Sequence, residues 1–424
     1  MKGINVKIPY GSTELSVQVA EENLIGIYSP KDVRSVENVT AEVERALAEP
    51  IGAASLADLV RGKDKIVIVA DDNTRLTPTD KIIPVLLNEM NKAGIEDGQI
   101  TIVIALGTHR DMTKEEIITK FGEEVVKRVK VINHDFVHPE ALVDLGTTPN
   151  GTPISINKIA YEADFKIGIG SIVPHHIPGF AGGAKIVQPG ISGLATTGST
   201  HLLSVQEKRS YLGVEDNPVR RELNQIARTI GMNVIFNTVL DRFGNVVRGF
   251  YGDLEEAFKQ GVELSKEVYA VSVPEEADIV LASSHPCDLE FWQAHKTLYA
   301  ADKAVKEKGI IIVVTPCPEG VSKVHGEMIE ITRKSSQEVR DMVKQGEIKD
   351  LTGAALAIAW AQVKERETVY IVSDGITPEE GLKLGFTPFR TVADALQKAR
   401  EIKGANAKVT ILTHAPDTLP IINN

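Results

Sequence analysis

Short apolar runs alternate with helical patterns along nearly the whole chain, and this alternation constrains the fold more than any other feature of the sequence. Residues 65–70 and 99–105 have the composition of buried strands. The segment 82–92 between them has a helical pattern, and we expect Pro84 to limit how early that helix can begin. Such alternation predicts an α/β fold whose parallel sheets carry helices on both faces.

The same pattern divides the chain into two parts. Further strands are predicted at 129–132, 165–170, 233–240, 278–282, 309–314, 368–372 and 408–412. Further helices are predicted at 114–129, 253–269, 293–308 and 336–345. The alternation restarts after residue 270, which predicts two doubly wound parallel-sheet domains, residues 1–270 and 271–399, with an active-site cleft between them. The last strand suits either sheet, so residues 400–424 could rejoin the first domain.

Composition narrows the class of protein. The 424 residues are 42% hydrophobic and 25% charged, as in ordinary soluble globular proteins. The net charge of -11 argues against a nucleic-acid-binding surface, and no apolar run approaches the roughly 20 residues of a membrane helix. Residues 1–8 alternate like a strand and contain no signal-peptide core. With only Cys287 and Cys317 as thiols, the sequence predicts a cytoplasmic protein.

Polar residues follow three successive strands of the first predicted domain. Residues 71–75 (Asp-Asp-Asn-Thr-Arg), 107–110 (Gly-Thr-His-Arg) and 171–176 (Ser-Ile-Val-Pro-His-His) come directly after predicted strands. Polar residues also follow two strands of the second domain, at 283–288 and 315–320. Because ligands of parallel sheets bind outside the carboxyl ends of the strands, we expect a site where these two edges meet.

Two of these segments favour an anionic ligand. Arg75 stands beside a predicted helix start, where free N–H groups also attract anions, although 71–75 could be only a turn. The run 179–185 (Gly-Phe-Ala-Gly-Gly-Ala-Lys) is typical of a loop that approaches a phosphate, or of a tight strand-to-helix connection. Lys185 is followed by Ile186 rather than Ser or Thr, so the loop is no Walker motif.

Histidines are the candidate acid–base groups. His109 and His175 stand at neighbouring strand ends, and a reference pKa of about 6.5 suits proton transfer in both directions. We interpret six others as structural: His134, His138, His285, His295, His325 and His414. The sequence has no His-Glu-x-x-His or Cys-x-x-Cys pattern, so a metal held by protein ligands alone is not expected. Gln293 and Lys296 share a helix face, which could also be a solvated one.

Together these motifs resemble the nickel-pincer-dependent lactate racemase family. The resemblance rests on Asp-Asp-Asn-Thr-Arg, Gly-Thr-His-Arg, Pro-His-His-Ile-Pro-Gly-Phe-Ala-Gly-Gly-Ala-Lys and the Ser-Thr-His that ends at His201. It continues into the second domain at 292–296 (Trp-Gln-Ala-His-Lys) and at Trp360. Order, spacing and strand context all agree.

The resemblance implies a cofactor that the residues alone could not reveal. It is a pyridinium-3,5-bisthiocarboxylate mononucleotide carrying Ni(II), made by separate biosynthetic enzymes. It is attached through a thioamide-type bond to a lysine, which corresponds to Lys185, and a histidine that corresponds to His201 ligates the nickel. The implied cofactor contacts are Asp72, Asn73, Thr74 and Arg75, with the mononucleotide phosphate near the backbone N–H groups of Thr74 and Arg75.

The resemblance also implies the reaction: racemisation of a small 2-hydroxy acid, with lactate as the first expectation. The pincer would take the C2 hydrogen as hydride and return it to the other face of a bound 2-keto acid, with His109 and His175 as the two opposed bases. Arg75, Gln293 and Lys296 would hold the substrate. Trp292 and Trp360 are the expected pocket walls, and Trp292 departs from the tyrosine frequent in the family, which bears on substrate size.

Two other classes of function fit parts of the same pattern. A nucleotide-dependent phosphotransferase could use the loop 179–185, although the residue after Lys185 counts against it. A non-catalytic sugar-phosphate or nucleotide sensor could use the same cleft, but it would not need His109, His175 and His201 together.

Overall fold

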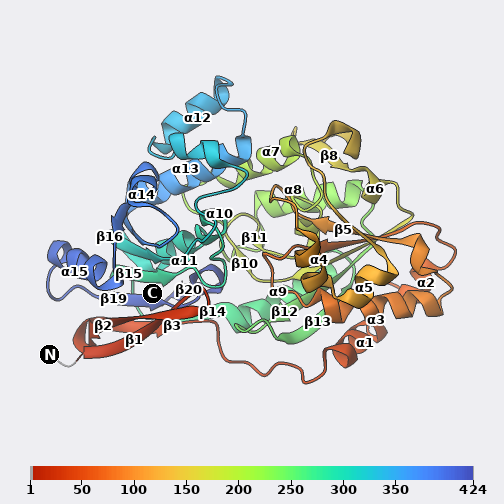
Figure 1. Cartoon of the computed structure of the whole chain (residues 1–424), viewed down its shortest axis with the longest axis horizontal. Helices are drawn as coiled ribbons and strands as arrows, with labels where there is room; N and C mark the ends of the chain where they lie inside the picture. Colours follow the sequence, from red (N-terminus) through yellow and green to blue (C-terminus); the bar gives the residue numbers. More distant parts are fainter. Residues whose placement is uncertain (1–2, 424) are drawn as a thin grey trace.

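The computed structural model describes residues 3–423, which form two six-stranded sheets with helices on both faces (Figure 1). The predicted α/β class with two doubly wound domains is therefore confirmed. Figure 1 shows the sheet of the first domain on the right and that of the second domain on the left, with the short strands β10 and β11 between them.

The first sheet has the strand order β13-β12-β9-β4-β5-β6, and every neighbouring pair is parallel except β12 with β13. Its strands are β4 (Ile66–Asp71), β5 (Ile100–Ala105), β6 (Lys130–Asn133), β9 (Phe165–Ser171), β12 (Val234–Leu240) and β13 (Val246–Gly252). Because helices cover both faces, all six residues of β4 are buried.

The second sheet is parallel throughout and has the order β18-β17-β16-β15-β19-β3. Its strands are β3 (Leu24–Tyr28), β15 (Ala277–Ser283), β16 (Val305–Val314), β17 (Thr368–Val372), β18 (Thr387–Phe389) and β19 (Val409–Leu412). Four two-stranded sheets complete the strands: β1 (Gly3–Tyr10) with β2 (Thr13–Ala20), β7 (Leu142–Thr147) with β8 (Pro153–Asn157), β10 (Pro174–His175) with β11 (Gly179–Phe180), and β14 (Ala270–Val273) with β20 (Leu419–Ile422).

Both ends of the chain differ from the predicted division. Strand β3 pairs with β19 in the second sheet, and the hairpin β1–β2 packs on that sheet, as Figure 1 shows (red beside blue). Ile8 and Val17 of the hairpin join Leu281 and Ile312 in one apolar cluster, which buries surface that the hairpin alone could not. The C-terminal strands β19 and β20 also stay with the second domain, so residues 400–424 do not rejoin the first. Met1 and Lys2 of the predicted first strand lie outside the described residues.

The helices carry the connections between strands. Those of the first domain are α1 (Val39–Ala48), α2 (Leu56–Val60), α3 (Thr79–Lys92), α4 (Lys114–Phe121), α5 (Glu123–Arg128), α6 (Lys158–Tyr161), α7 (Leu194–Ser204), α8 (Pro218–Thr229) and α9 (Glu256–Tyr269). Those of the second domain are α10 (Phe291–Ala294), α11 (Thr297–Ala304), α12 (Ser336–Lys344), α13 (Leu351–Arg366), α14 (Pro378–Lys383) and α15 (Val392–Lys403).

Three predicted helices have different limits. The helix expected at 114–129 is broken at Gly122, whose φ of 84° ends α4 and starts α5. Helix α3 begins at Thr79, because Pro84 removes only one backbone hydrogen bond and is tolerated within the helix. The helix expected at 293–308 is two short helices, and residues from Val305 onward already belong to strand β16.

One apolar core joins the inner faces of the two sheets. Val67 and Val69 of β4 belong to the same buried cluster as Val280 of β15 and Val313 of β16. The other face of β4 packs in a separate cluster with α3, and the outer face of the second sheet packs with α15 and the hairpin β1–β2. The shared inner core fixes the carboxyl edges of both sheets near each other.

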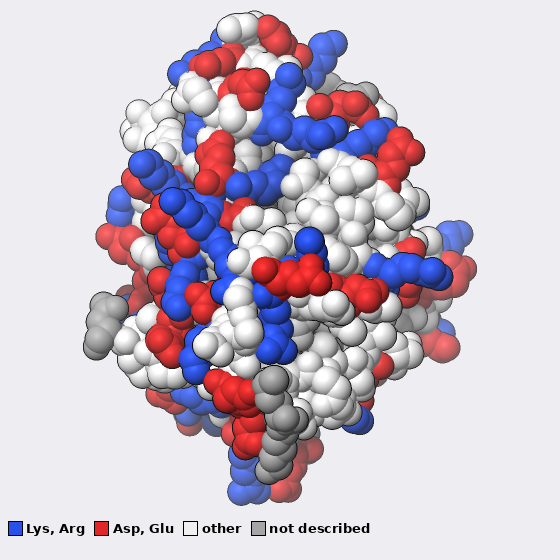
Figure 2. All heavy atoms as spheres, turned by 90° about the vertical axis from the view of Figure 1, so that its left-hand side faces the viewer, with Lys and Arg blue, Asp and Glu red and all other residues white. Residues whose placement is uncertain are grey.

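The surface is mixed in charge. On the face in Figure 2, which is the left-hand side of Figure 1, basic and acidic side chains lie interspersed. Among the described residues, no helix is both long and apolar enough to cross a lipid bilayer.

We expect the hairpin β1–β2 to contribute to global stability. Ile8 is completely buried and Ile27 on β3 is 46% exposed, so Ile8→Ala should cost about 2–5 kcal/mol and Ile27→Ala less than about 1 kcal/mol. Urea denaturation followed by circular dichroism measures both. Equal midpoints for the two variants would contradict the packing described here.

Candidate active site

A cavity opens where the carboxyl edges of the two sheets meet, with an empty volume of about 1010 Å³ that includes open solvent. Loops after β4, β5 and β9 line it from the first domain, and α10 and its C-terminal end line it from the second. The cavity brings together most of the residues predicted from sequence: Asp72, Arg75, His109, His175, Lys185, His201, Trp292, Gln293 and Lys296.

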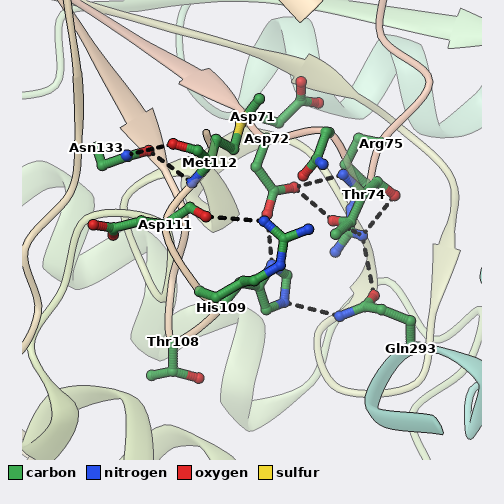
Figure 3. A network of polar contacts seen from close by, with 12 residues as sticks. Asp71, Asp72, Thr74, Arg75, Thr108, His109, Asp111, Met112, Asn133 and Gln293 are labelled. Atoms are coloured by element: carbon green, nitrogen blue, oxygen red, sulfur yellow. Dashed lines mark hydrogen bonds and ion pairs between the residues drawn. The ribbon is translucent and has the colours of Figure 1, made fainter. Parts of the chain in front are cut away.

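His109 is held between the two domains (Figure 3). Its Nδ1 lies 2.6 Å from Asp72 Oδ2, and its Nε2 lies 2.9 Å from Gln293 Nε2. A ring that donates from Nδ1 to the carboxylate keeps a lone pair on Nε2, which then accepts from the Gln293 amide. Burial alone would raise the pKa of Asp72, but His109 and Arg75 hold it well below its usual range, so this carboxylate stays ionised.

Gln293 occupies the centre of the cleft. Its amide oxygen accepts hydrogen bonds from Arg75 Nη1 at 3.3 Å and from Lys296 Nζ, while its amide nitrogen donates to His109. The side chain is only 4% exposed. The amide oxygen of Gln293 is therefore held by two cations, and its amide nitrogen faces an imidazole. A ligand with a carboxylate beside a hydroxyl group would make the same contacts.

His175 lies deeper than His109. Its Nδ1 accepts the Ile177 N–H at 3.2 Å, which leaves Nε2 as the ring nitrogen available to a ligand. Its ring stacks on His176 with centroids 4.6 Å apart. Burial is the main cause that lowers the pKa of His175 well below its usual range, so the ring is neutral.

Positive charges crowd the floor of the cavity. Burial, followed by the charge of the neighbouring Arg75, lowers the pKa of Lys296 to about 8. Burial also lowers the pKa of Lys185 well below its usual range, with Arg75, Lys296 and Arg220 acting in the same sense. Within the described part of the chain, Lys185 Nζ makes no hydrogen bond or ion pair. It is therefore a free amine that opens into the cavity.

The glycine-rich run serves the protein's own packing, contrary to the expected phosphate cradle. Gly182 has φ of 83°, and a Cβ there would lie 2.7 Å from Ile172 Cγ1. Gly183 has φ of 57°, and its N–H donates to Asn237 Oδ1 at 2.7 Å. The Lys185 N–H points to the Gly182 carbonyl at 3.3 Å. These amides are used internally, so the glycines shape a turn that presents Lys185.

His201 has the geometry of a single metal ligand. It lies on α7, and its Nδ1–H donates to the Thr197 carbonyl at 2.8 Å, which leaves the Nε2 lone pair free. Burial lowers the pKa of His201 to about 4, so the ring is neutral as ligation requires. Among the described residues, no three histidine, cysteine, aspartate or glutamate side chains are placed to hold a metal ion together.

Three predicted site residues are not in the cavity wall. Asn73 is exposed and donates to Glu116 Oε1 at 3.1 Å. Thr74 bonds Asp72 through its hydroxyl and its N–H, and the Arg75 N–H points to the Asp72 carbonyl at 3.2 Å, so these amides are not free for a phosphate. Trp360 is fully buried in α13 and packs on Phe291, because α13 turns that side toward the apolar core.

Sequence reasoning missed three histidines around the cavity. His176 lies between His175 and Tyr299, with ring centroids 4.2 Å from Tyr299, and both of its nitrogens lack partners among the described residues. His295, predicted to be structural, lines the cavity. His325, also predicted to be structural, stacks on Trp292 at 3.8 Å and joins Thr108 at 3.0 Å. The sequence offered one indication for His176 and His295: each stands next to a predicted site residue, His175 and Lys296 respectively.

Comparisons with known proteins identify relatives of this chain. Residues 10–213 match the family described as lactate racemase N-terminal domain, and residues 272–422 match lactate racemase C-terminal domain. The lactate racemase of Thermoanaerobacterium thermosaccharolyticum is 32% identical over 428 residues, or 99% of each chain. That of Lactiplantibacillus plantarum is 30% identical over 429 residues, again 99% of each chain.

Solved structures agree as well. The lactate racemase apoprotein from Thermoanaerobacterium thermosaccharolyticum has a TM-score of 0.88 at 30% identity, covering 99% of this chain and 100% of that chain. A protein from Thermotoga maritima has a TM-score of 0.71 at 21% identity, covering 92% of this chain and 100% of that chain, and shows the fold alone.

Two α/β domains that enclose a basic, histidine-lined cleft define a two-domain enzyme with its site between the domains. Two relatives that match over 99% of the chain, together with both family matches, identify the family. The chain belongs to the lactate racemase family and is an isomerase of the racemase type.

The pairing of Asp72 with His109 should make stability depend on pH. A carboxyl whose pKa is depressed stabilises the fold above its unfolded pKa of about 3.9, and this contribution is lost as pH falls through the lower folded value. Asp72→Asn should therefore cost about 1–3 kcal/mol at pH 7, and its difference from wild type should narrow below about pH 4.

Urea denaturation from pH 7 to pH 3 measures this difference, with Asp216→Asn, whose side chain is 80% exposed, as the control. A deficit of the same size at every pH would contradict the electrostatic role of Asp72.

Proposed function

We propose that this protein racemises a small 2-hydroxy acid, with lactate as the first substrate to test. The observation that supports this most directly is Gln293, whose amide makes three contacts that a 2-hydroxy acid would make. The substrate carboxylate takes the place of the amide oxygen between Arg75 and Lys296, and the hydroxyl group takes the place of the amide nitrogen at His109 Nε2. The full-length relatives that carry the name lactate racemase point the same way.

The cofactor that fits these residues is the nickel-pincer mononucleotide. The unpartnered Lys185 amine would serve for covalent attachment, and the free Nε2 of His201 would ligate the nickel. When bound, the group would supply reversible hydride-acceptor chemistry at C2 of the substrate. Separate biosynthetic enzymes supply the cofactor in the cytoplasm.

The chain's own groups do the remaining work. Arg75 and Lys296 hold the substrate carboxylate and neutralise it, which fixes C2 in one place. His109, oriented by ionised Asp72, takes the hydroxyl proton at Nε2 from one enantiomer. His175 approaches from the first domain's deeper loop and exchanges the proton for the other enantiomer. Trp292 is 6% exposed and limits the space beside the substrate.

Replacing either histidine should block racemisation in both directions, because each full turnover uses one histidine as base and the other as acid. We expect His109→Ala and His175→Ala to lose at least about 10²–10⁴-fold in rate with cofactor-loaded protein. Chiral chromatography of lactate from each pure enantiomer measures the rate. His138→Ala, a change at an exposed histidine, is the control. Near wild-type racemisation by either variant would return that histidine to a structural role.

We expect Lys185 to be required for covalent attachment of the cofactor, and His201 to be required for binding of nickel. Lys185→Ala should abolish a covalent adduct in protein co-produced with the cofactor-making enzymes, because the Lys185 amine lines the cavity and has no partner among the described residues. His201→Ala should retain the adduct but lose nickel, because its ring ligates and does not attach. Intact-mass spectrometry and elemental analysis measure both. An adduct on the Lys185→Ala protein, or full nickel content in His201→Ala, would contradict the respective assignment.

A further inference from the structure

Arg220 is a buried cation, and Glu255 favours its charge without forming an ion pair with it among the described residues. Arg220 is 4% exposed, and among the described residues it makes no ion pair with a carboxylate. It is also the third residue of α8, where the helix N-terminus disfavours positive charge. Burial lowers its pKa to about 9. A charge kept under three unfavourable conditions indicates a role other than stability.

Both side-chain hydrogen bonds of Arg220 go to the glycine-rich turn. Its Nη1 donates to the Gly182 carbonyl at 3.2 Å, and its Nη2 donates to the Phe180 carbonyl. Its guanidinium carbon lies 4.2 Å from the centroid of the Phe258 ring, which supports the group from one face. The Gly182 carbonyl also accepts the N–H of Lys185 at 3.3 Å. Arg220 and Lys185 therefore share one carbonyl oxygen.

We propose that Arg220 is a positioning residue for Lys185: it fixes the turn that presents the lysine and places a positive charge beneath that turn. The proposal deepens, and rests on, the assignment of Lys185 as the attachment point of an acyl-type group. Only a neutral amine has the lone pair that attacks an acyl or thioacyl carbon. Desolvation near another cation is a general means of activating lysine.

Several charged groups surround the Lys185 amine, and their balance favours the neutral form. Arg75 from the loop after β4, Lys296 from the end of α10 and Arg220 from α8 disfavour a proton on it, whereas Asp72 favours one. The neighbouring imidazoles are those of His175, His176 and His201. Of the three cations, Arg75 and Lys296 are the groups proposed to hold substrate, so a ligand anion would neutralise them. Arg220 lies beneath the turn, where its charge persists when the cleft is filled.

The test measures Lys185 reactivity in apoprotein, independently of the cofactor. A brief pulse of acetic anhydride acetylates neutral amines: the Lys185 Nζ–C bond forms, acetate leaves and the amine proton passes to water. Peptide mass spectrometry at a series of pH values gives the rate at Lys185, with Lys127, which is 73% exposed, as internal reference. In wild type, Lys185 should react at neutral pH, and its rate relative to Lys127 should be highest there.

Variants separate charge from shape. Arg220→Gln should lower the Lys185 rate at pH 7 by about tenfold and recover the wild-type plateau at high pH, since a nearby charge is lost. Arg220→Lys should retain the wild-type profile, and Arg221→Gln, a change at the exposed neighbour on the same helix, should have no effect. Arg220→Met has a side chain of similar length and no hydrogen-bond donor. It takes the place of Arg220→Gln if that protein does not fold.

Two results would overturn the proposal. A wild-type pH profile of Lys185 acetylation in Arg220→Gln or Arg220→Met would show that Arg220 has no electrostatic role. An acetylation rate reduced equally at every pH would show that Arg220 is a structural support alone. Failure of the cofactor assignment would appear elsewhere, as the absence of an adduct on Lys185 in loaded protein, with the acetylation profile unchanged.

Discussion

Positive charge concentrated in the cleft of a protein with net charge -11 is the constraint on which the rest of the site depends. Arg75, Lys185 and Lys296 meet there, and Arg220 adds a further cation from beneath the turn. Several positive charges in one buried site are stable only if an anion binds among them or if one of the groups loses its proton. The arrangement uses both solutions: an anionic ligand suits Arg75 and Lys296, and a neutral amine suits Lys185. The carboxylate of Asp72 is then left for His109.

Neither domain forms this site alone. The first domain supplies Arg75 after β4, His109 after β5, His175 after β9, Lys185 after β11 and His201 on α7, and the second domain supplies Gln293 and Lys296 on and after a helix of four residues. The polar contacts that join the halves at the cleft include Gln293 to His109, Gln293 to Arg75, His325 to Thr108 and the ion pair of Arg110 with Glu319 at 3.2 Å. Such contacts are easily exchanged for those of a ligand. The apolar core behind them keeps both edges in place while that exchange occurs.

The sequence predicted the parallel sheets and most of the cavity because both depend on local patterns, namely apolar runs followed at once by polar residues. It did not predict that residues 24–28 pair with 409–412, since that contact joins segments at opposite ends of the chain. Trp360 was expected in the pocket wall, but which side of α13 faces the core depends on packing against Phe291. The glycines near Lys185 were expected to approach a phosphate or to form a tight connection. Their neighbours in space are Ile172 and Asn237, and a local sequence pattern does not indicate contacts with residues so far along the chain.

The position of β3 within the second sheet has a mechanical consequence. The chain leaves the second domain after Tyr28, builds the whole first domain, and returns through Tyr269 into β14, so two segments cross between the domains. They cross side by side, with the Lys31 N–H bonded to the Val268 carbonyl at 2.8 Å. These two adjacent connections hold the first domain on the second, in addition to the apolar core that the two sheets share. Connections and core together keep His109 and Gln293 in one register across the cleft.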